Sequence, residues 1–130
     1  MKYLCLIYDE EKRLQAMTRS EMDALMQEYF AFSKAITTSG HMLGGNDLQP
    51  VANATTVRVR NGKVSTTDGP FAETKEQLGG YFLINATDLN EAIQIAAKIP
   101  PARVGSIEVR PIRPIRENVA AARTGSRASR

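Results

Sequence analysis

The side chains with the greatest capacity for chemistry gather in one short polar run, residues 67–76. Its sequence, Thr-Asp-Gly-Pro-Phe-Ala-Glu-Thr-Lys-Glu, brings acidic, basic and hydroxyl groups into a single loop. Asp68 is its candidate general acid or base. The structural alternative is that Asp-Gly-Pro forms a turn in which the carboxylate accepts backbone N–H groups.

His41 is the single histidine of the chain and lies just past the end of an expected helix. A cationic imidazole there is favourable to the helix dipole, which is a sufficient structural role. The functional alternative pairs His41 with Asp68 as a carboxylate–imidazole dyad. One histidine without a cysteine partner argues against a zinc site, and we expect no metal and no cofactor.

The charged residues that follow Pro70, namely Glu73, Lys75 and Glu76, are typical of a solvated helical turn. The functional alternative makes Lys75 an anchor for an anionic substrate. Arg58 is expected on the polar face of a hairpin, where a surface or interface role competes with substrate binding.

Composition restricts the class of protein. The 130 residues suit one domain with a single core, and no apolar stretch reaches the length of a membrane span. Of the formal charge of +3, the segment 117–130 supplies +2 from three arginines and one glutamate, so residues 1–116 are nearly neutral. That neutrality disfavours nucleic-acid binding. We expect a domain over residues 1–116 and a flexible basic tail over 117–130.

Cys5 is the one cysteine and lies in the apolar run 2–8. A single cysteine makes no intramolecular disulfide, which predicts a cytoplasmic location. The run lacks the form of a signal peptide and predicts a buried strand that contains an unreactive thiol.

Two amphipathic helices are expected. Each begins with an N-cap residue followed three positions later by glutamate, at Thr18 and at Asp88. Gly40 ends the first helix and Pro100-Pro101 the second. A charged loop is expected at residues 9–17. The expected strands cover residues 2–8, 41–48, 55–60, 63–67, 80–86 and 106–110.

This order of elements predicts an α+β fold of the ferredoxin-like, split βαβ type, with an inserted β-hairpin. Its two helices cover only one face of the sheet. We therefore expect the other face to be buried in a homodimer. The glycine pairs Gly44-Gly45 and Gly79-Gly80 are expected to allow bulges or close backbone approach.

Asn61-Gly62, between two alternating strands, predicts a two-residue hairpin turn and fixes the register. Val59 then faces Val64. In the same register Thr55 faces Asp68, and directly opposed residues share a face of the hairpin. We expect the apolar face of the hairpin to be the inner one, which would direct Asp68 toward the interior.

Four segments resemble the YCII-related family, in its DGPF-motif branch. They are residues 54–58, 67–76, 79–84 and 107–112. The similarity runs from Met1 to about Ile115 and implies a ferredoxin-like, dimeric α/β-barrel fold. The wider family includes proteins proposed to be enzymes from a His–Asp pair in a cleft. The motif places the aspartate at Asp68, whereas many DGPF-type relatives have no histidine at the position of His41.

Two function hypotheses follow, and they leave catalysis open. In the first, a homodimer binds a small molecule in a cleft near Asp68, with His41 as its acid–base partner and Arg58 or Lys75 as anchors. In the second, the protein is a non-catalytic interaction module linked to transcriptional regulation, because some relatives are associated with extracytoplasmic-function sigma factors.

Overall fold

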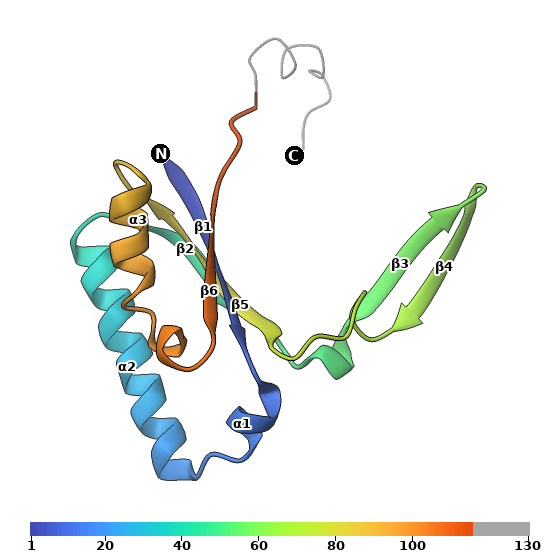
Figure 1. Cartoon of the computed structure of the whole chain (residues 1–130), viewed down its shortest axis with the longest axis horizontal. Helices are drawn as coiled ribbons and strands as arrows, with labels where there is room; N and C mark the ends of the chain where they lie inside the picture. The colour runs from blue at the N-terminus through green and yellow to red at the C-terminus, as the bar shows by residue number, and fades with distance from the viewer. Residues whose placement is uncertain (116–130) are drawn as a thin grey trace.

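The computed structural model describes residues 1–115, and the expected tail 117–130 lies outside them. A four-stranded sheet, a separate two-stranded hairpin and three helices make up the fold (Figure 1). The strands are β1 (Lys2–Asp9), β2 (Met42–Asp47), β3 (Thr55–Arg60), β4 (Lys63–Asp68), β5 (Gln77–Asn85) and β6 (Ser106–Pro111). The helices are α1 (Glu11–Gln15), α2 (Arg19–Thr38) and α3 (Leu89–Ala96), with 3-10 turns η1 (Val51–Asn53) and η2 (Pro100–Arg103).

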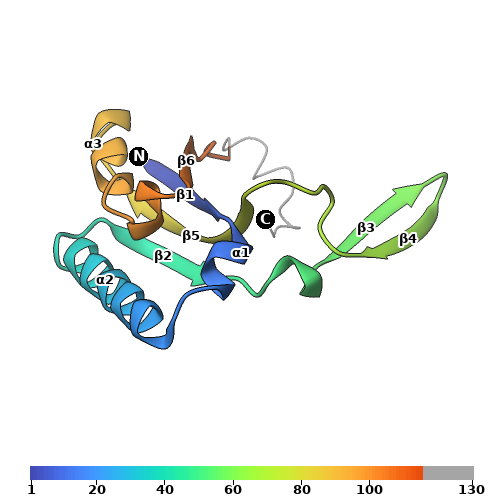
Figure 2. The ribbon, with the colours of Figure 1, turned by 60° about the horizontal axis from the view of Figure 1, so that its bottom comes forward.

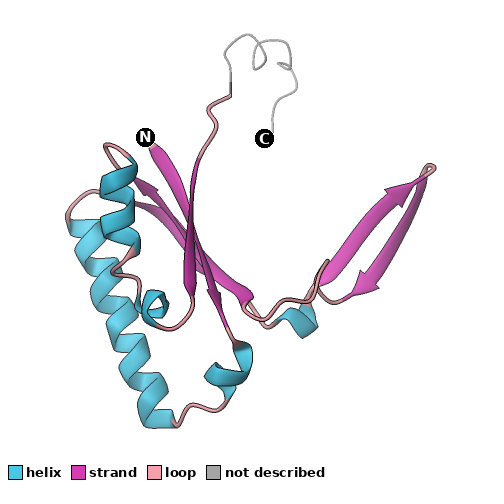
Figure 3. Ribbon diagram, in the orientation of Figure 1, coloured by secondary structure: helices cyan, strands magenta, loops and turns pink. Residues whose placement is uncertain are grey.

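The main sheet is antiparallel throughout and has the order β2-β5-β1-β6. β1 and β2 are joined through α2 and flank β5, while β6 pairs with the other edge of β1 (Figure 3). This is the split βαβ arrangement, so the predicted ferredoxin-like α+β fold is confirmed.

The core lies between the sheet and the helices α2 and α3, which cover the same face (Figure 2). Phe32 of α2 meets Phe82 of β5 edge to face, with ring centroids 5.1 Å apart. The buried apolar residues are Tyr3, Cys5, Ile7, Phe32, Ile36, Phe82, Ile84, Ala86, Ala92, Ile95, Ala96 and Ile99. Cys5 is fully buried, as the sequence predicts, and burial raises the pKa of its thiol to about 11.

The other face of the main sheet has no described helix over it. Alternation along β1 and β5 turns a second set of side chains away from the helices, and these are half-buried. We call this set the open face: Leu4, Leu6, Tyr8, Tyr81 and Leu83.

The helix ends follow the predicted signals. The hydroxyl of Thr18 accepts from the Glu21 N–H at 3.1 Å, and the Glu21 carboxylate accepts in return from the Thr18 N–H. Asp88 accepts from the Glu91 N–H at 2.9 Å. Side chains thus accept hydrogen bonds from free N–H groups at the start of α2 and of α3.

Two local expectations are wrong. The charged loop at residues 9–17 does not form, because Asp9 extends β1 and residues 11–15 make the short helix α1. The apolar spacing after Asp88 predicts that Leu89 and Ile93 are buried, but in α3 they are 49% and 50% exposed. The short helix places Ala92, Ile95 and Ala96 against the sheet instead.

The glycine pairs have the expected geometry. A Cβ on Gly45 would lie 2.9 Å from the Phe82 ring, and one on Gly80 would lie 2.9 Å from the Asn46 carbonyl oxygen. The register of the main sheet shifts beside Gly44 and beside Gly79. These positions therefore allow the close approach of β2 to β5 and two local irregularities.

Strands β3 and β4 form a separate ribbon, which we call the arm (residues 55–68). Asn61 and Gly62 have φ values of 53° and 76°, as a two-residue turn between antiparallel strands requires. Val59 pairs with Val64 and Thr55 with Asp68, so the predicted register is confirmed.

The expectation that the apolar face of the arm points inward is wrong. Val57, Val59 and Val64 are 59%, 55% and 69% exposed. The arm pairs with no strand of the main sheet and projects away from it (Figure 1). Asp68 is consequently an exposed residue at the base of the arm rather than an inward carboxylate.

Candidate functional site

A groove of about 930 Å³ opens at the base of the arm. Residues from the segments 48–56, 70–74 and 77–78 line it, together with Tyr8. Its volume is in the range of small-molecule sites. We call it the arm-base groove.

The lining of the arm-base groove is largely apolar. Its larger apolar side chains are Leu48, Val51, Phe71 and Leu78. Polar groups come mainly from threonine, glutamine and asparagine. Among the described lining residues, Glu73 is the one charged side chain, and no lysine or arginine is present. Such a lining favours a neutral or cationic ligand with a large apolar part.

Two side chains outside the motif hold the walls of the groove in place. The Glu11 carboxylate accepts from the Val51 N–H at 3.0 Å, which fixes η1. The N–H of Glu11 donates to the Gln77 side-chain oxygen at 2.9 Å, and the Gln77 amide donates to the Thr74 carbonyl at 2.6 Å. Glu11 and Gln77 therefore tie η1, the start of β5 and the loop before it into one unit.

The Asp-Gly-Pro turn forms the junction between the arm and the groove. Gly69 has φ of 103°, a conformation that other residues rarely adopt. Its N–H donates to the Ala54 carbonyl at 2.7 Å, and its carbonyl accepts from the Thr56 hydroxyl at 2.9 Å. The turn thereby directs Pro70 and Phe71 into the wall of the groove, where Phe71 remains 80% exposed.

Asp68 lies at the rim of this groove. It pairs with Thr55, which is a lining residue, and opposed residues share a face of the arm. Within residues 1–115 its carboxylate forms no hydrogen bond and no ion pair, so it does not cap the N–H groups of the following turn. The side chain is available to a ligand.

Arg58 and Lys75 lie outside the lining of the groove. Arg58 is exposed on the polar face of the arm, and Lys75 is exposed in the loop just after Thr74. The helical turn expected at residues 73–76 does not form, because the Thr74 hydroxyl and the Gln77 amide bind the carbonyl groups of this loop instead.

His41 lies at the other end of the main sheet. It directly precedes β2, whose first residue Met42 pairs with Ile84, whereas the groove begins beyond the last residue of β2. Six strand residues separate the two ends by about 20 Å. One chain therefore does not bring His41 and Asp68 together.

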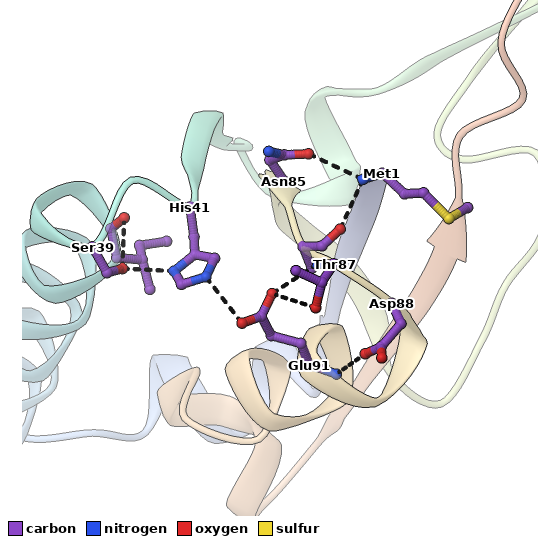
Figure 4. Close-up of polar contacts among 9 residues, drawn as sticks. Met1, Ser39, His41, Asn85, Thr87, Asp88 and Glu91 are labelled. Carbon is purple, nitrogen blue, oxygen red and sulfur yellow. Dashed lines mark hydrogen bonds and ion pairs between the residues drawn. The ribbon is translucent and has the colours of Figure 1, made fainter.

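The neighbours of His41 belong to two helix ends (Figure 4). Its Nδ1 lies 2.6 Å from the Ser39 hydroxyl, and its Nε2 lies 3.4 Å from a Glu91 carboxylate oxygen. Glu91 also accepts from the N–H of Thr87 at 2.8 Å, and this bond is the main cause of its lowered pKa. The Ser39 hydroxyl donates to the Ile36 carbonyl. The cluster thus joins the end of α2 to the start of α3, and none of these residues lines the groove.

The sequence gives no direct signal for a polar group on the open face. The Tyr8 hydroxyl donates to Glu108 at 3.3 Å, and Arg110 binds the other oxygen of the same carboxylate at 2.6 Å. Burial, and then the Glu108 charge, raise the pKa of Tyr8, while the Arg110 hydrogen bond lowers that of Glu108. Tyr8 also lines the arm-base groove, so the open face and the groove are continuous.

A second unanticipated group surrounds Asp9, which is 6% exposed. Arg13 binds both of its carboxylate oxygens, one turn further along the chain. Nearby, burial and the charges of Asp47 and Asp9 raise the pKa of Tyr29 to about 12. The one sequence signal for this group is the i, i+4 spacing of Asp9 and Arg13.

Tyr29→Phe is expected to reduce the loss of stability in alkali. The pKa of Tyr29 is 10.0 when unperturbed and about 12 in the fold, so its contribution is complete below pH 10 and is lost as pH rises toward 12. Urea unfolding at about pH 8 and about pH 11 measures the change. The wild type should lose more free energy of unfolding than the variant, and equal losses would contradict the assignment.

Residues 1–115 contain no group of three or more histidine, cysteine, aspartate or glutamate side chains placed to hold a metal ion. Their helices also include none with the length and apolar character needed to cross a bilayer.

These features define a ferredoxin-like α+β domain whose inserted arm and Asp-Gly-Pro loop enclose a groove. A family model of the YCII-related domain matches residues 1–116. The chain therefore belongs to the YCII-related family, as the resemblance predicts, while its place in the DGPF-motif branch stays a prediction. An uncharacterized protein of Rhizobium meliloti (strain 1021) is 36% identical to it over 114 residues, which are 86% of this chain and 92% of the relative.

Proposed function

We propose that this YCII-related protein binds a small, largely apolar molecule in the arm-base groove and that it does so as a cytoplasmic homodimer. The observation that carries the proposal is the groove itself, about 930 Å³ in volume and mainly apolar. The loop with the most distinctive sequence of the chain, residues 67–76, supplies one of its walls.

The charges of the groove suggest the class of ligand. Glu73 lines it and Asp68 lies at its rim, whereas Arg58 and Lys75 lie outside. A neutral molecule, or one with a cationic end, therefore suits the site better than an anion. The exposed ring of Phe71 offers an aromatic surface to the apolar part of the ligand.

The homodimer rests on the open face. Its five side chains form a continuous apolar area in the middle of the main sheet, bordered by Glu108 and Arg110 on β6. An apolar area with a polar border is typical of a surface that associates with another protein. A second copy of the chain is the simplest partner, because one self-complementary surface then serves both subunits.

Binding can be tested with N-phenyl-1-naphthylamine, a neutral apolar dye that fluoresces when it leaves water. The dye should bind the folded wild type, and Phe71→Ala should weaken binding about tenfold, since one aromatic contact is worth about 1.4 kcal/mol. Phe30→Ala is the matched control, because Phe30 is 68% exposed on α2 and does not line the groove. Equal effects of the two substitutions, or no dye binding by the wild type, would contradict the proposal.

We further propose that Asp68 acts as a general acid or base on the molecule bound in the groove. The support for this role is the carboxylate at the rim of the groove, which has no partner within residues 1–115. The wild type and Asp68→Asn can be incubated with the same metabolite mixture and the products analysed by mass spectrometry. A product formed by the wild type and lost in Asp68→Asn would support catalysis, whereas turnover that survives the substitution would exclude Asp68 as the acid–base group.

The second candidate function is a non-catalytic interaction module linked to transcriptional regulation. The observations in its favour are the exposed arm, whose three valines are uncovered in the described chain, and the net charge of +2 of residues 117–130. A purified extracytoplasmic-function sigma factor should then be retained by the immobilised protein, and removal of residues 117–130 should abolish retention. No retention by the full chain would exclude this candidate.

A further inference from the structure

The arm is an isolated ribbon with both faces exposed. Val57, Val59 and Val64 form a continuous apolar stripe along one of them, and each is more than half exposed. A two-stranded hairpin on its own is marginally stable in water. Three aligned valines on a projecting hairpin therefore indicate that another surface covers this face.

The direction of the arm shows which surface lies within reach. In Figure 1 and in the rotated view of Figure 2, the arm projects from the side of the main sheet that faces away from α2 and α3. The open face lies on this same side, so a molecule seated on the open face lies beside the arm. Six-residue strands make the arm about 20 Å long. This is a large fraction of the diameter of a small domain, about 30 Å.

The arm and the rest of the described chain have net charges of opposite sign. The arm contains Arg58, Arg60 and Lys63 against Asp68, a net +2. The other described residues, which we call the body, contain ten lysines and arginines against twelve aspartates and glutamates, a net −2. The three cations of the arm form no ion pair within residues 1–115. These cations lie on the face of the arm opposite the valines, so the body of a second copy attracts the arm through its opposite net charge and not through ion pairs across the valine face.

We infer that the arm packs its valine face against the body of a second copy of this chain while that copy is seated on the open face. The inference rests on the homodimer of the proposed function and adds a second contact to it. Under two-fold symmetry each arm contacts the body of the other subunit. Thr55 and Thr56 belong both to the arm and to the groove, so the second copy also closes the open side of each groove.

Shortening the arm tests the second contact. Residues 57–66 are replaced by Asn-Gly, which keeps the Thr56–Thr67 pair around a two-residue turn. The main sheet does not pair with the arm, so the variant should keep the helical circular dichroism signal and the cooperative unfolding of the wild type. Sedimentation equilibrium should show a dissociation constant at least tenfold higher than that of the wild type. An unchanged dissociation constant would overturn the inference.

Photo-crosslinking locates the contact without shortening the arm. The photoreactive amino acid p-benzoylphenylalanine is placed at Val64 on the valine face or, as the matched control, at Ser65 on the opposite face. Mixing isotope-labelled and unlabelled chains distinguishes crosslinks between copies from crosslinks within one copy. Val64 should crosslink to the body of the other copy and Ser65 should not. Crosslinks from Val64 only to its own chain, residues 116–130 included, would overturn the inference.

The outcomes separate the inference from the proposals on which it rests. A full chain that sediments as a monomer at all concentrations overturns the homodimer and the arm contact together. A stable dimer that is indifferent to the shortened arm overturns the arm contact alone. Binding of a short DNA duplex that is lost in Arg58→Ala, with the dimer unaffected by the arm, would assign the cations of the arm to nucleic acid instead. The comparison of Phe71→Ala with Phe30→Ala is a separate measurement and tests the lining of the groove itself.

Discussion

Leu6→Asp is expected to give a folded monomer. Leu6 occupies the middle of the open face, between Tyr81 of β5 and Glu108 of β6. In a dimer that buries this face, the new carboxylate would be desolvated without a partner and close to the Glu108 charge. In a monomer it would be hydrated. We expect the dissociation constant of the dimer to rise at least 100-fold, which corresponds to about 2.7 kcal/mol.

Sedimentation equilibrium measures this constant, and circular dichroism checks the fold. Gln27→Asp is the matched control, because it introduces the same charge on the exposed side of α2 and should leave the dimer unchanged. A variant Leu6→Asp that dimerises as strongly as the wild type would exclude the open face as the dimer interface.

Ile84→Ala is expected to cause the largest loss of stability. Ile84 is fully buried on the helix-facing side of β5, where it lies between Tyr3 of β1 and Met42 of β2. Truncating a fully buried isoleucine removes apolar contacts and leaves a cavity, at a cost of about 2–5 kcal/mol. The total stability of a domain this size is about 5–15 kcal/mol, so the variant retains only a part of it.

Urea unfolding of both variants tests this expectation. Ile93→Ala is the matched control, because it makes the same chemical change at a position of α3 that is 50% exposed. Its cost should be below about 1 kcal/mol, since alanine also has the higher helix propensity. Equal losses from the two substitutions would mean that Ile84 does not form part of the rigid core.

Signals confined to a few neighbouring residues predicted most of the fold. The capping pairs at Thr18 and Asp88 and the turn at Asn61-Gly62 act through their own backbone, so they can be read without the tertiary structure. Helix α1 was missed because five residues are too few to be helical by propensity. Its formation depends on Arg13 binding the buried Asp9 and on Glu11 binding η1.

The candidate site was predictable only in part. The run 67–76 identifies one wall of the groove, but the other walls come from residues 48–56 and from Tyr8, which the topology brings together. The alternation of valines in the arm identifies its apolar face, but it contains no information on what covers that face. The proximity of His41 to Glu91 depends on how the start of α3 lies beside the end of α2, and no local pattern encodes this.

The place of β1 in the sheet has a consequence for synthesis on the ribosome. β1 precedes the other strands in the chain, yet both of its partners, β5 and β6, come from residues 77–111. Contacts of such long range form late and slowly. Until Ser106–Pro111 has left the ribosome, the apolar strand β1 has at least one unpaired edge, which is a template for aggregation. The edge of β1 is therefore covered only when the final strand of the main sheet has been synthesised and has paired with it.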